Sequence, residues 1–388
     1  GARDLGNEHE VVMGLARDVG SGELIGPRLQ RAGFIAKKSP YTAPTGTPVE
    51  TLEQALAQID DYAGKGYQQV KIYSSIPPEW VAPMAERMHG HGMRLSGHIP
   101  AFMTAEEAVR RVLVVALAAA SLNFIMGFGG MVALGHAGFV GVGAYAVVML
   151  SDAGVTSAWV VWAAAMALAA LAALLIGAVS LRTRGVYFIM ITLAFAQMLY
   201  FVFVSLRSYG GDDGYTLPMR PLLGLGLNGA DESTLYWVVL ALVALVLWWL
   251  DRATASRFGA ALTGIRDNET RMRALGYPVY LLQLTAFVLA GAVAGLAGAL
   301  LATGNSFVSP SMMHWTQSAT LIVMVVIGGL GRRWGGPVGA AVWLTLEEVL
   351  KLNTDYWHMP LGALLIVTAL YAPQGLAALA DRRARSAR

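Results

Sequence analysis

Residues 279–303 read Val279-Tyr-Leu-Leu-Gln-Leu-Thr-Ala-Phe-Val-Leu-Ala-Gly-Ala-Val-Ala-Gly-Leu-Ala-Gly-Ala-Leu-Leu-Ala-Thr303, without a single charged side chain. A helix needs about 20 mostly apolar residues to cross a hydrocarbon core about 30 Å thick. Eight further apolar stretches follow the same pattern, and nine in all disfavour a soluble protein with buried core helices. They predict an all-α polytopic membrane protein with about eight to nine transmembrane helices, some broken or tilted. The other stretches are residues 112–126, 131–150, 157–181, 186–206, 235–250, 318–331, 335–350 and 360–378.

Charge is divided unevenly along the chain. Residues 1–111 hold 13 acidic and 12 basic side chains, which is 25 charged of 111 and usual for a soluble domain. Residues 112–388 hold the remaining 12 acidic and 16 basic ones, which is 28 charged of 277. The low second value argues against an ordinary cytosolic enzyme. Cysteine is absent, which excludes disulfides and zinc–thiolate sites, and a net charge of +3 does not indicate nucleic acid as a partner.

Basic side chains between the apolar stretches predict the orientation in the membrane. If the helices alternate in direction, one side receives 13 of the 16 basic residues and the other receives three. Cytoplasmic loops carry the excess of Lys and Arg, so we expect the richer side, and with it the C-terminus, to be cytoplasmic. The richer side has Arg182, Arg184, Arg252, Arg257, Arg266, Arg271, Arg273, Arg332, Arg333, Arg382, Arg383, Arg385 and Arg388, and the other side has Arg207, Arg220 and Lys351.

Small residues gather in two places. Gly291, Gly295 and Ala299 form a small-xxx-small ridge, which favours close helix packing inside one subunit over a subunit interface. The glycines between Gly127 and Gly143 are denser than packing needs. They predict an irregular or broken helix, which is allowed at membrane depth only where protein or a water-filled path satisfies the backbone.

The loop between Asp251 and Pro278 is about as long as a short helix. Leu262, Ile265 and Met272 form an apolar stripe, with charged residues on the other faces. Such a helix either lies on the membrane or enters a groove on a soluble partner, and composition leaves both open.

Motifs from about Val112 to Leu379 resemble the inner-membrane permease of branched-chain amino acid ABC transporters. Each motif is weak alone, and their order along the chain makes the set specific. They are Gly129-Gly-Met-Val-Ala-Leu-Gly-His-Ala-Gly-Phe139, Gly143-Ala-Tyr145, Leu181-Arg-Thr-Arg-Gly-Val-Tyr-Phe188, Thr192-Leu-Ala-Phe195, Gly210-Gly-Asp-Asp-Gly214, Ser256-Arg-Phe-Gly-Ala-Ala-Leu262, Ile265-Arg-Asp-Asn-Glu269, Ala294-Gly-Leu-Ala-Gly-Ala-Leu300, Gly328-Gly-Leu-Gly331, Gly335-Gly-Pro-Val-Gly339 and Pro373-Gln-Gly-Leu376.

The resemblance implies a passive half-channel in the bacterial inner membrane. It also implies three kinds of partner: a second related permease, two cytoplasmic ATPases that drive transport, and an external solute-binding protein. We expect no cofactor in this chain, because ATP would be used by the partner and no Gly-x-x-x-x-Gly-Lys-Ser/Thr motif occurs. The resemblance makes the cytoplasmic loop the ATPase-coupling segment, with Phe258, Gly259, Leu262, Ile265, Arg266, Asp267, Asn268 and Glu269.

Gly135, His136 and Tyr145 are candidates for the transport path. An ionisable group at membrane depth is often functional, and the alternative for His136 is a neutral ring hydrogen-bonded to a carbonyl. The chain departs from the family at Ala133, where serine is usual, and at Arg332-Arg333-Trp334, where small residues are usual. These departures bear on the choice among branched-chain amino acids and other small polar solutes.

Residues 1–111 have a different pattern. Residues 69–73 and 94–98 predict buried strands, and residues 51–64 and 78–90 predict helices, an order typical of an incomplete α/β barrel. Motifs such as Val70-Lys-Ile-Tyr73 and Ser96-Gly-His-Ile-Pro100 resemble the amidohydrolase superfamily, near its imidazolonepropionase-like branch. In that family the residues at the positions of Lys71 and His98 bind metal ions. Two ligands do not make a catalytic zinc site, so we expect a truncated, non-catalytic segment.

The sequence thus predicts two segments, a truncated amidohydrolase-like α/β segment over residues 1–111 and a permease domain over residues 112–388. The favoured function is that of a permease subunit rather than an enzyme. The alternatives are a membrane-tethered metal-dependent amidohydrolase and a non-functional chimera of the two families. No linker separates the segments, and residues 106–111 run directly into the apolar stretch, so we expect the joint not to be a working domain boundary.

Overall fold

The chain forms two compact units, Gly1–Met103 and Thr104–Arg388. The computed structural model describes residues 2–4, 29–37, 47–67, 69–72, 76, 78–97, 105–217, 220–224, 232–353, 358–371 and 375–377. The division falls ahead of the composition change at Arg111, because helix α4 (Ala105–Asn123) already begins at Ala105. Residues 106–111 are therefore the charged first turns of an otherwise apolar helix.

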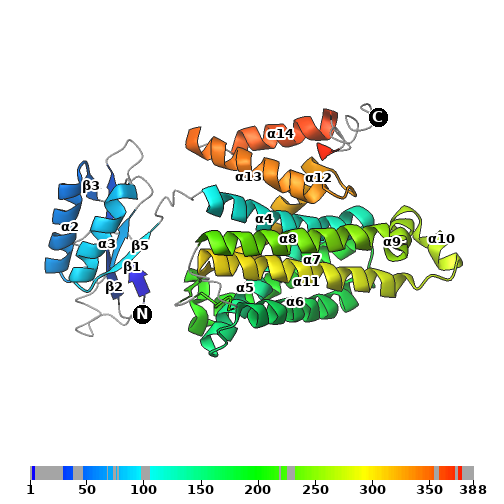
Figure 1. The fold of residues 1–388 in the computed structure, drawn as a ribbon, viewed down its shortest axis with the longest axis horizontal. Coiled ribbons are helices and arrows are strands. Elements are labelled where there is room, and N and C mark those ends of the chain that lie inside the picture. Colours follow the sequence, from blue (N-terminus) through cyan, green and yellow to red (C-terminus); the bar gives the residue numbers. More distant parts are fainter. Residues whose placement is uncertain are drawn as a thin grey trace. The chain divides into compact units, whose positions relative to one another are not determined.

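The first unit is a parallel β-sheet with two described helices (Figure 1). The strands lie in the order β1 (Ala2–Asp4), β2 (Leu29–Lys37), β4 (Gln69–Ile72) and β5 (Arg94–Gly97), and β3 (Thr47–Val49) pairs with β2. Helices α2 (Leu52–Gly64) and α3 (Pro78–Gly90) each follow one strand and precede the next. The elements predicted near residues 51–64, 69–73, 78–90 and 94–98 thus all occur.

Helices α2 and α3 of this unit are joined by apolar and polar contacts. Ile59, Met84 and Met88 are completely buried in its core. At the surface, Asp60 accepts hydrogen bonds from the Arg87 guanidinium at 3.0 Å and pairs with the His91 ring at 2.7 Å. The His91 ring, with the Arg87 guanidinium, holds the pKa of the Asp60 carboxyl below its usual value.

The second unit is a bundle of helices (Figure 1). Its longest member, α11 (Val279–Asn305), packs against α4, α5 (His136–Asp152) and α6 (Ala158–Ser180). After α4 and the π-helix Phe124–Phe128 come α5 (His136–Asp152), α6 (Ala158–Ser180), α7 (Val186–Ser205), α8 (Glu232–Ala255), α9 (Arg257–Asp267), α10 (Glu269–Ala274), α11 (Val279–Asn305), α12 (Trp315–Gly328), α13 (Gly335–Asn353) and α14 (His358–Tyr371).

Five helices in the described part of the chain are long and apolar enough to cross a membrane. This number is smaller than the predicted eight to nine, although a helix lies in every apolar stretch. The difference arises because α5, α12 and α14 span only 17, 14 and 14 residues, and α13 carries Glu347, Glu348 and Lys351 in its second half. The five are residues 106–128, 158–180, 186–205, 233–255 and 279–305.

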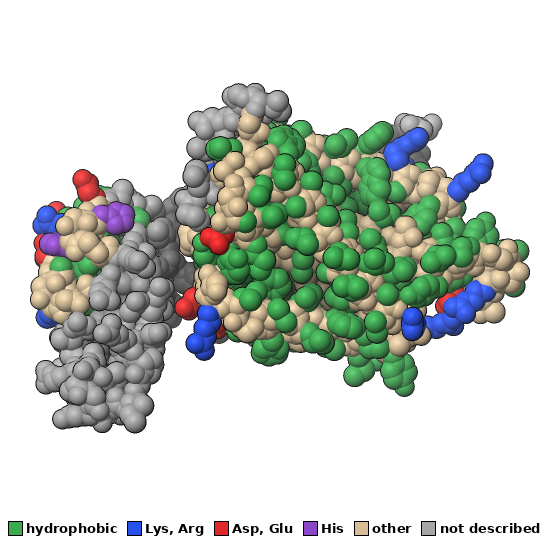
Figure 2. Space-filling view, turned by 90° about the horizontal axis from the view of Figure 1, so that it is seen from below, with side chains coloured by type: hydrophobic (Ala, Val, Ile, Leu, Met, Phe, Trp, Pro, Cys, Tyr) green, Lys and Arg blue, Asp and Glu red, His purple; other side chains and the backbone are tan. Residues whose placement is uncertain are grey.

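The surface of the second unit is apolar along its length and charged toward its ends. Figure 2 shows hydrophobic side chains spread over the face of this unit, with Lys, Arg, Asp and Glu gathered toward its two ends. Large apolar side chains in the middle of α6 and α8, such as Leu171 and Leu245, are exposed by more than half. In water such an apolar face would be costly, whereas a hydrocarbon core accepts it.

The small-xxx-small ridge of α11 packs inside the unit, as the packing interpretation predicts. A Cβ added to Gly291 would lie 2.4 Å from the Cβ of Ala173, and one added to Gly295 would lie 2.3 Å from the Cβ of Ala169. Both alanines belong to α6. These positions accept only glycine because the two helices touch there.

Candidate functional site

The segment between α8 and α11 forms two short helices, α9 and α10, where the sequence predicts one. Asn268 separates them, and its side chain accepts a hydrogen bond from the Arg271 amide at 2.9 Å and thereby caps α10. The Ser256 hydroxyl caps α9 by accepting from the Gly259 amide. We call the end of the bundle that carries these helices the α9 end (Figure 1).

The apolar stripe of this segment faces the chain's own interior. The side chains of Leu262, Ile265 and Met272 are 0%, 3% and 9% exposed. Leu262 belongs to the main core, and the half-buried Phe258 ring stacks on the Phe124 ring of the π-helix at 6.4 Å. The suggestion that this stripe enters a groove on a partner is therefore wrong, because intramolecular packing already buries it.

Arg266 and Glu269 are also tied to the chain. Arg266 Nη1 donates a 2.6 Å hydrogen bond to the carbonyl of Gly127, inside the π-helix. Its Nε and Nη2 both donate to Asp267 Oδ1. Glu269 accepts from Arg273 at 2.7 Å and from Arg184, in the α6–α7 connection, at 3.0 Å. Among the charged coupling residues, Asp267 is the most outward, with 63% of its side chain exposed compared with 37% for Arg266 and 23% for Glu269.

Two apolar residues of this end were missed by the sequence reasoning. Leu275 and Tyr277 follow α10 and are 65% and 46% exposed, beside the exposed Arg271 and Arg273. Apolar side chains within the turn Leu275-Gly-Tyr-Pro278 could have indicated them.

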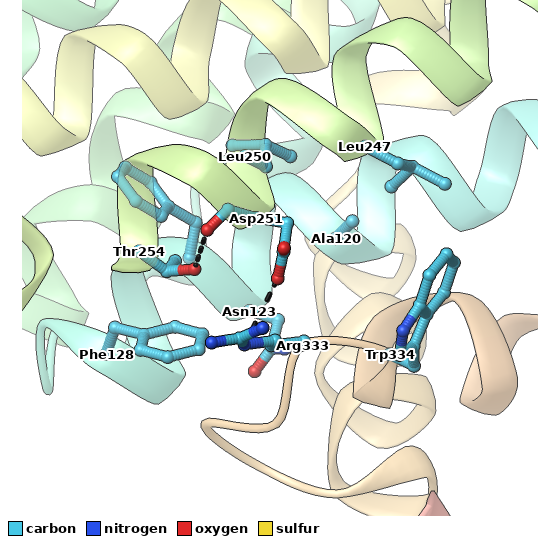
Figure 3. A pocket seen from close by; sticks show the side chains of 10 residues that line it. Ala120, Asn123, Phe128, Leu247, Leu250, Asp251, Thr254, Arg333 and Trp334 are labelled. Atoms are coloured by element: carbon cyan, nitrogen blue, oxygen red, sulfur yellow. Dashed lines mark hydrogen bonds and ion pairs between the residues drawn. The ribbon is translucent and has the colours of Figure 1, made fainter. Parts of the chain in front are cut away.

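A pocket at the same end lies between α4, α8 and the α12–α13 connection (Figure 3). Leu247 and Leu250 give it an apolar wall, and Trp334 lies at its edge. Asp251 of α8 pairs with Arg333 at 3.1 Å across the pocket. Arg333 was noted in the sequence as a departure from the family, and this ion pair gives it a structural partner.

Asn123, a lining residue of that pocket, fixes the α12–α13 connection. It is 2% exposed, its Nδ2 donates to the Arg332 carbonyl at 2.7 Å, and its Oδ1 accepts from the Gly331 amide at 3.0 Å. A buried amide that satisfies two backbone groups specifies one position for the loop. Sequence reasoning missed Asn123, although a lone amide in an otherwise apolar stretch is a usable indication.

The glycine-rich segment breaks the helix, as the sequence predicts. The α4 backbone ends in the π-helix Phe124–Phe128, the next seven residues are not helical, and α5 starts at His136. Gly127 allows the Gly331 backbone to approach, since an added Cβ would lie 2.3 Å from the Gly331 nitrogen. Gly130 has a φ of +70°, which side-chain-bearing residues rarely adopt.

The predicted path residues lie in the packed interior. His136 is fully buried, and its Nε2 lies 2.8 Å from the Ser121 hydroxyl. Because that hydroxyl donates to the Ala118 carbonyl, it accepts from the ring, so the partner of His136 is a hydroxyl and not a carbonyl. Tyr145 is also fully buried and stacks on Phe203 at 4.4 Å.

Gly135 brings α5 against α7, because an added Cβ would lie 2.4 Å from the Thr192 carbonyl oxygen. None of the three path candidates lines the pocket beside Asn123 or the hollow on α7 that includes Gln197 and Phe201. Their part in transport stays a prediction. In the first unit, Lys71 lies in β4, and His98 lies outside the described residues.

A family model for the branched-chain amino acid transport system permease component matches residues 104–369. The chain belongs to this permease family. The match begins where the second unit begins, so the family covers the helical bundle. Members of the family are membrane transport components rather than enzymes. The amidohydrolase resemblance of residues 1–111 has no support from the comparisons.

Among similar proteins of the permease family is the high-affinity branched-chain amino acid transport system permease protein LivM of Escherichia coli K12, 30% identical over 278 residues. The LivM protein of Salmonella typhimurium is also 30% identical over 278 residues. Each alignment covers 66% of this chain and 65% of the relative. A probable LivM of Methanocaldococcus jannaschii is 27% identical over 157 residues, which is 36% of this chain and 45% of that protein. No solved structure matches.

Proposed function

We propose that this chain is a transmembrane permease subunit of an ABC importer for branched-chain amino acids or similar small polar solutes. The observation that carries the proposal is the family match over residues 104–369, on a bundle with five membrane-capable helices. The chain spans 65% of the length of the LivM proteins it matches, so their transport activity comes to it as a proposal. The names of these relatives point to branched-chain amino acids as the first solutes to test.

The partners follow from the same proposal. A second related permease completes the channel, two cytoplasmic ATPases supply the energy, and an external solute-binding protein delivers the solute. The chain itself then needs no cofactor, because ATP is used by the partner. Its place is the bacterial inner membrane, with the α9 end and the C-terminus in the cytoplasm. Two ion pairs, Arg184 with Glu269 and Arg333 with Asp251, support this orientation. They bring the α6–α7 connection, the α8–α11 segment and the α12–α13 connection, all rich in arginine, to one end of the bundle.

The experiment is reconstitution of uptake. The chain is expressed with the ATPases, permease and binding protein encoded beside its gene, and uptake of labelled leucine, isoleucine and valine into vesicles is measured. We expect uptake that requires ATP and that stops with an ATPase variant unable to hydrolyse it. An assembled complex that takes up none of these amino acids, nor small amides or urea, would contradict the proposal.

We also propose that the α9–α10 segment carries the ATPase contact. Because its apolar stripe is buried, the surface offered to the ATPase is Asp267, Asn268 and Arg271, with Leu275 and Tyr277 beside them. Phe258, Gly259, Leu262, Ile265, Arg266 and Glu269 then hold the segment in place.

The ATPase contact is tested by replacing Asp267 and Arg271 together with alanine. We expect weaker co-purification with the ATPase and unchanged membrane insertion. Arg252→Ala, at an exposed arginine of the same end that lies on α8, is the matched control and should leave co-purification unchanged. Equal ATPase binding by the double variant and by the control would overturn this assignment.

A further inference from the structure

The loop of residues 210–214 follows α7 and carries two adjacent, exposed carboxylates, Asp212 and Asp213. Helix α7 starts next to Arg184 at the α9 end, and its 20 residues rise about 30 Å, so the loop lies at the opposite end of the bundle. The orientation proposed above places that opposite end outside the cell. A solute on its way inward therefore reaches this loop before the packed interior.

Backbone contacts hold this loop in one shape. Gly210 has a φ of +87°, and a Cβ added to it would lie 2.0 Å from the Gly214 carbonyl oxygen, so the loop folds back on itself at a position that requires glycine. The strand β6 (Tyr215–Thr216) then pairs antiparallel with β7 (Phe307–Val308), which follows α11. The two carboxylates are therefore presented from a turn that is fixed to the bundle.

Asp212 differs from Asp213 in its neighbours. The Tyr200 hydroxyl, on α7, donates to Asp212 Oδ1 over 3.5 Å, which is long for a hydrogen bond. The Tyr200 ring packs edge to face on the His314 ring at 5.7 Å. Within the part of the chain that the structure describes, neither carboxylate forms an ion pair. The charge of Asp212 is thus available to a cation, in a setting that includes an aromatic ring.

A buried hydroxyl lies near Asp212. Tyr145 of α5 is 0% exposed, and its Oη has no hydrogen-bond partner among the described residues. Its ring stacks on Phe203, which follows Tyr200 by three residues on α7, and the Asp212 carboxylate is close enough to act on the hydroxyl electrostatically. Burial of a hydroxyl without a partner costs free energy, so the Tyr145 hydroxyl calls for a partner outside the described residues.

A primary ammonium group matches these three side chains. It has three donors, no acceptor and a positive charge, whereas the Asp212 carboxylate and the hydroxyls of Tyr200 and Tyr145 all accept hydrogen bonds. The face of a tyrosine ring also attracts a cation. By contrast, Asp212 repels a carboxylate, and a neutral amide or urea gains no charge attraction from it. The chemistry of the cluster therefore favours solutes that carry an ammonium group.

We propose that Asp212, with Tyr200 beside it, is the outer entry site for the ammonium group of the transported solute, and that the Tyr145 hydroxyl receives this group as it moves inward. The proposal rests on the proposed function and narrows the solute from small polar molecules to amino acids and amines. Asp212 is exposed and acts on binding. Tyr145 is buried and acts on the rate of passage.

The first test measures binding of small probes to the purified full chain by saturation-transfer NMR. The probes are leucine, 3-methylbutylamine, which keeps the ammonium group of leucine without the carboxylate, and 4-methylpentanoate, which keeps the carboxylate without the ammonium group. We expect leucine and 3-methylbutylamine to compete with each other. We expect 4-methylpentanoate not to displace leucine.

Asp212→Asn removes the charge at an exposed position, so the chain should fold and insert normally. Binding of leucine and of 3-methylbutylamine should weaken about threefold to fivefold, as expected for an exposed ion pair. Asp213→Asn is the matched control, because it removes the same charge from the neighbouring exposed residue. It should change binding by less than about twofold.

Tyr145→Phe tests the inner hydroxyl. The change keeps the ring that stacks on Phe203 and removes a buried hydroxyl without a described partner, so the thermal midpoint should stay the same or rise. We expect the maximal rate of leucine uptake by the assembled transporter to fall about threefold to tenfold, as for the loss of one hydrogen bond. Binding of the probes should stay within about twofold. A hydroxyl with a merely structural role would leave the maximal rate unchanged.

The outcomes separate this proposal from the proposed function. Weaker binding by Asp212→Asn, in a complex that shows no ATP-dependent uptake, would support the entry site and contradict the transport proposal. Leucine uptake with equal binding by Asp212→Asn and Asp213→Asn would do the reverse. Equal binding of 4-methylpentanoate and 3-methylbutylamine would overturn the preference for ammonium. If Asp212→Asn weakened only co-purification with the external binding protein, the assignment of Asp212 to the solute would be wrong.

Discussion

At the scale of single residues, Arg266 decides how the α9 end is held together. Its hydrogen bond to the Gly127 carbonyl joins the segment proposed to meet the ATPase to the π-helix that precedes the helix break. The sequence marks Arg266 as a candidate coupling residue, but a charge on a short helix gives no indication of whether it faces a partner or the chain. Whether Arg266 faces a partner or the chain depends on Gly127, which lies 139 positions away in the sequence.

Replacing Arg266 with alanine should destabilise the bundle. The change removes a charge-assisted hydrogen bond to a part-buried carbonyl, which is worth about 1–2 kcal/mol for a side chain that remains partly exposed. We expect the midpoint of thermal unfolding in detergent to fall by a few degrees. Arg271→Ala, on the exposed side of α10, should change stability by less than about 0.5 kcal/mol. Equal effects of the two changes would show that the Arg266–Gly127 bond contributes nothing.

A second residue-scale prediction concerns Gly127. A methyl group there would lie 2.3 Å from the Gly331 nitrogen and from Asn123 Oδ1, so Gly127→Ala requires the backbone to move. We expect a loss of about 3 kcal/mol or more, or failure to fold. Gly362→Ala is the control, because a Cβ at Gly362 in α14 meets nothing within 4 Å and should be neutral or stabilising. The measurement is the yield of monodisperse protein and its thermal midpoint.

At the scale of elements, the α9–α10 segment shows what periodicity can and cannot predict. The spacing of Leu262, Ile265 and Met272 correctly indicates amphipathic helical structure, which Asn268 divides into α9 and α10. It does not indicate which core the apolar side enters, because intramolecular and intermolecular burial use the same residue types. Likewise, the glycine series predicts a break near Gly130, but it does not show where α5 begins, which depends on tertiary contacts such as the hydrogen bond from the Ala137 amide to the Ser318 hydroxyl.

The two leucines of this segment provide a matched test. Leu262 is fully buried and Leu275 is 65% exposed. Leu262→Ala should lower the free energy of unfolding by about 2–5 kcal/mol, the usual cost of a cavity in a core. Leu275→Ala should leave stability nearly unchanged and weaken ATPase co-purification. If Leu262→Ala weakened ATPase binding without loss of stability, the orientation of α9 described here would be wrong.

At the scale of the whole molecule, composition predicts two segments, one of them a helical membrane bundle. The motifs predict that this bundle belongs to the permease family. Fewer of the described helices than predicted are long and apolar enough to cross a membrane, because hydropathy does not show where a helix stops. Residues 129–135 are apolar or small, yet they form turns rather than helix, and Gly130 lies against the Arg266 side chain there. The division between the compact units lies ahead of the composition change because the charged start of α4 has the composition of a soluble helix.

The position of that boundary leads to a prediction for truncated chains. Arg110 is 6% exposed and donates to the Gly304 carbonyl at 3.2 Å, and Glu106 accepts from Ser233 at 2.9 Å. A chain that begins at residue 104 keeps both contacts, whereas one that begins at residue 112 loses them together with the first turns of α4. We therefore expect the longer chain to insert and unfold at a higher temperature in detergent than the shorter one. Equal thermal midpoints for the two would place the boundary at Arg111 after all, and failure of both would mean that the bundle needs residues 1–103.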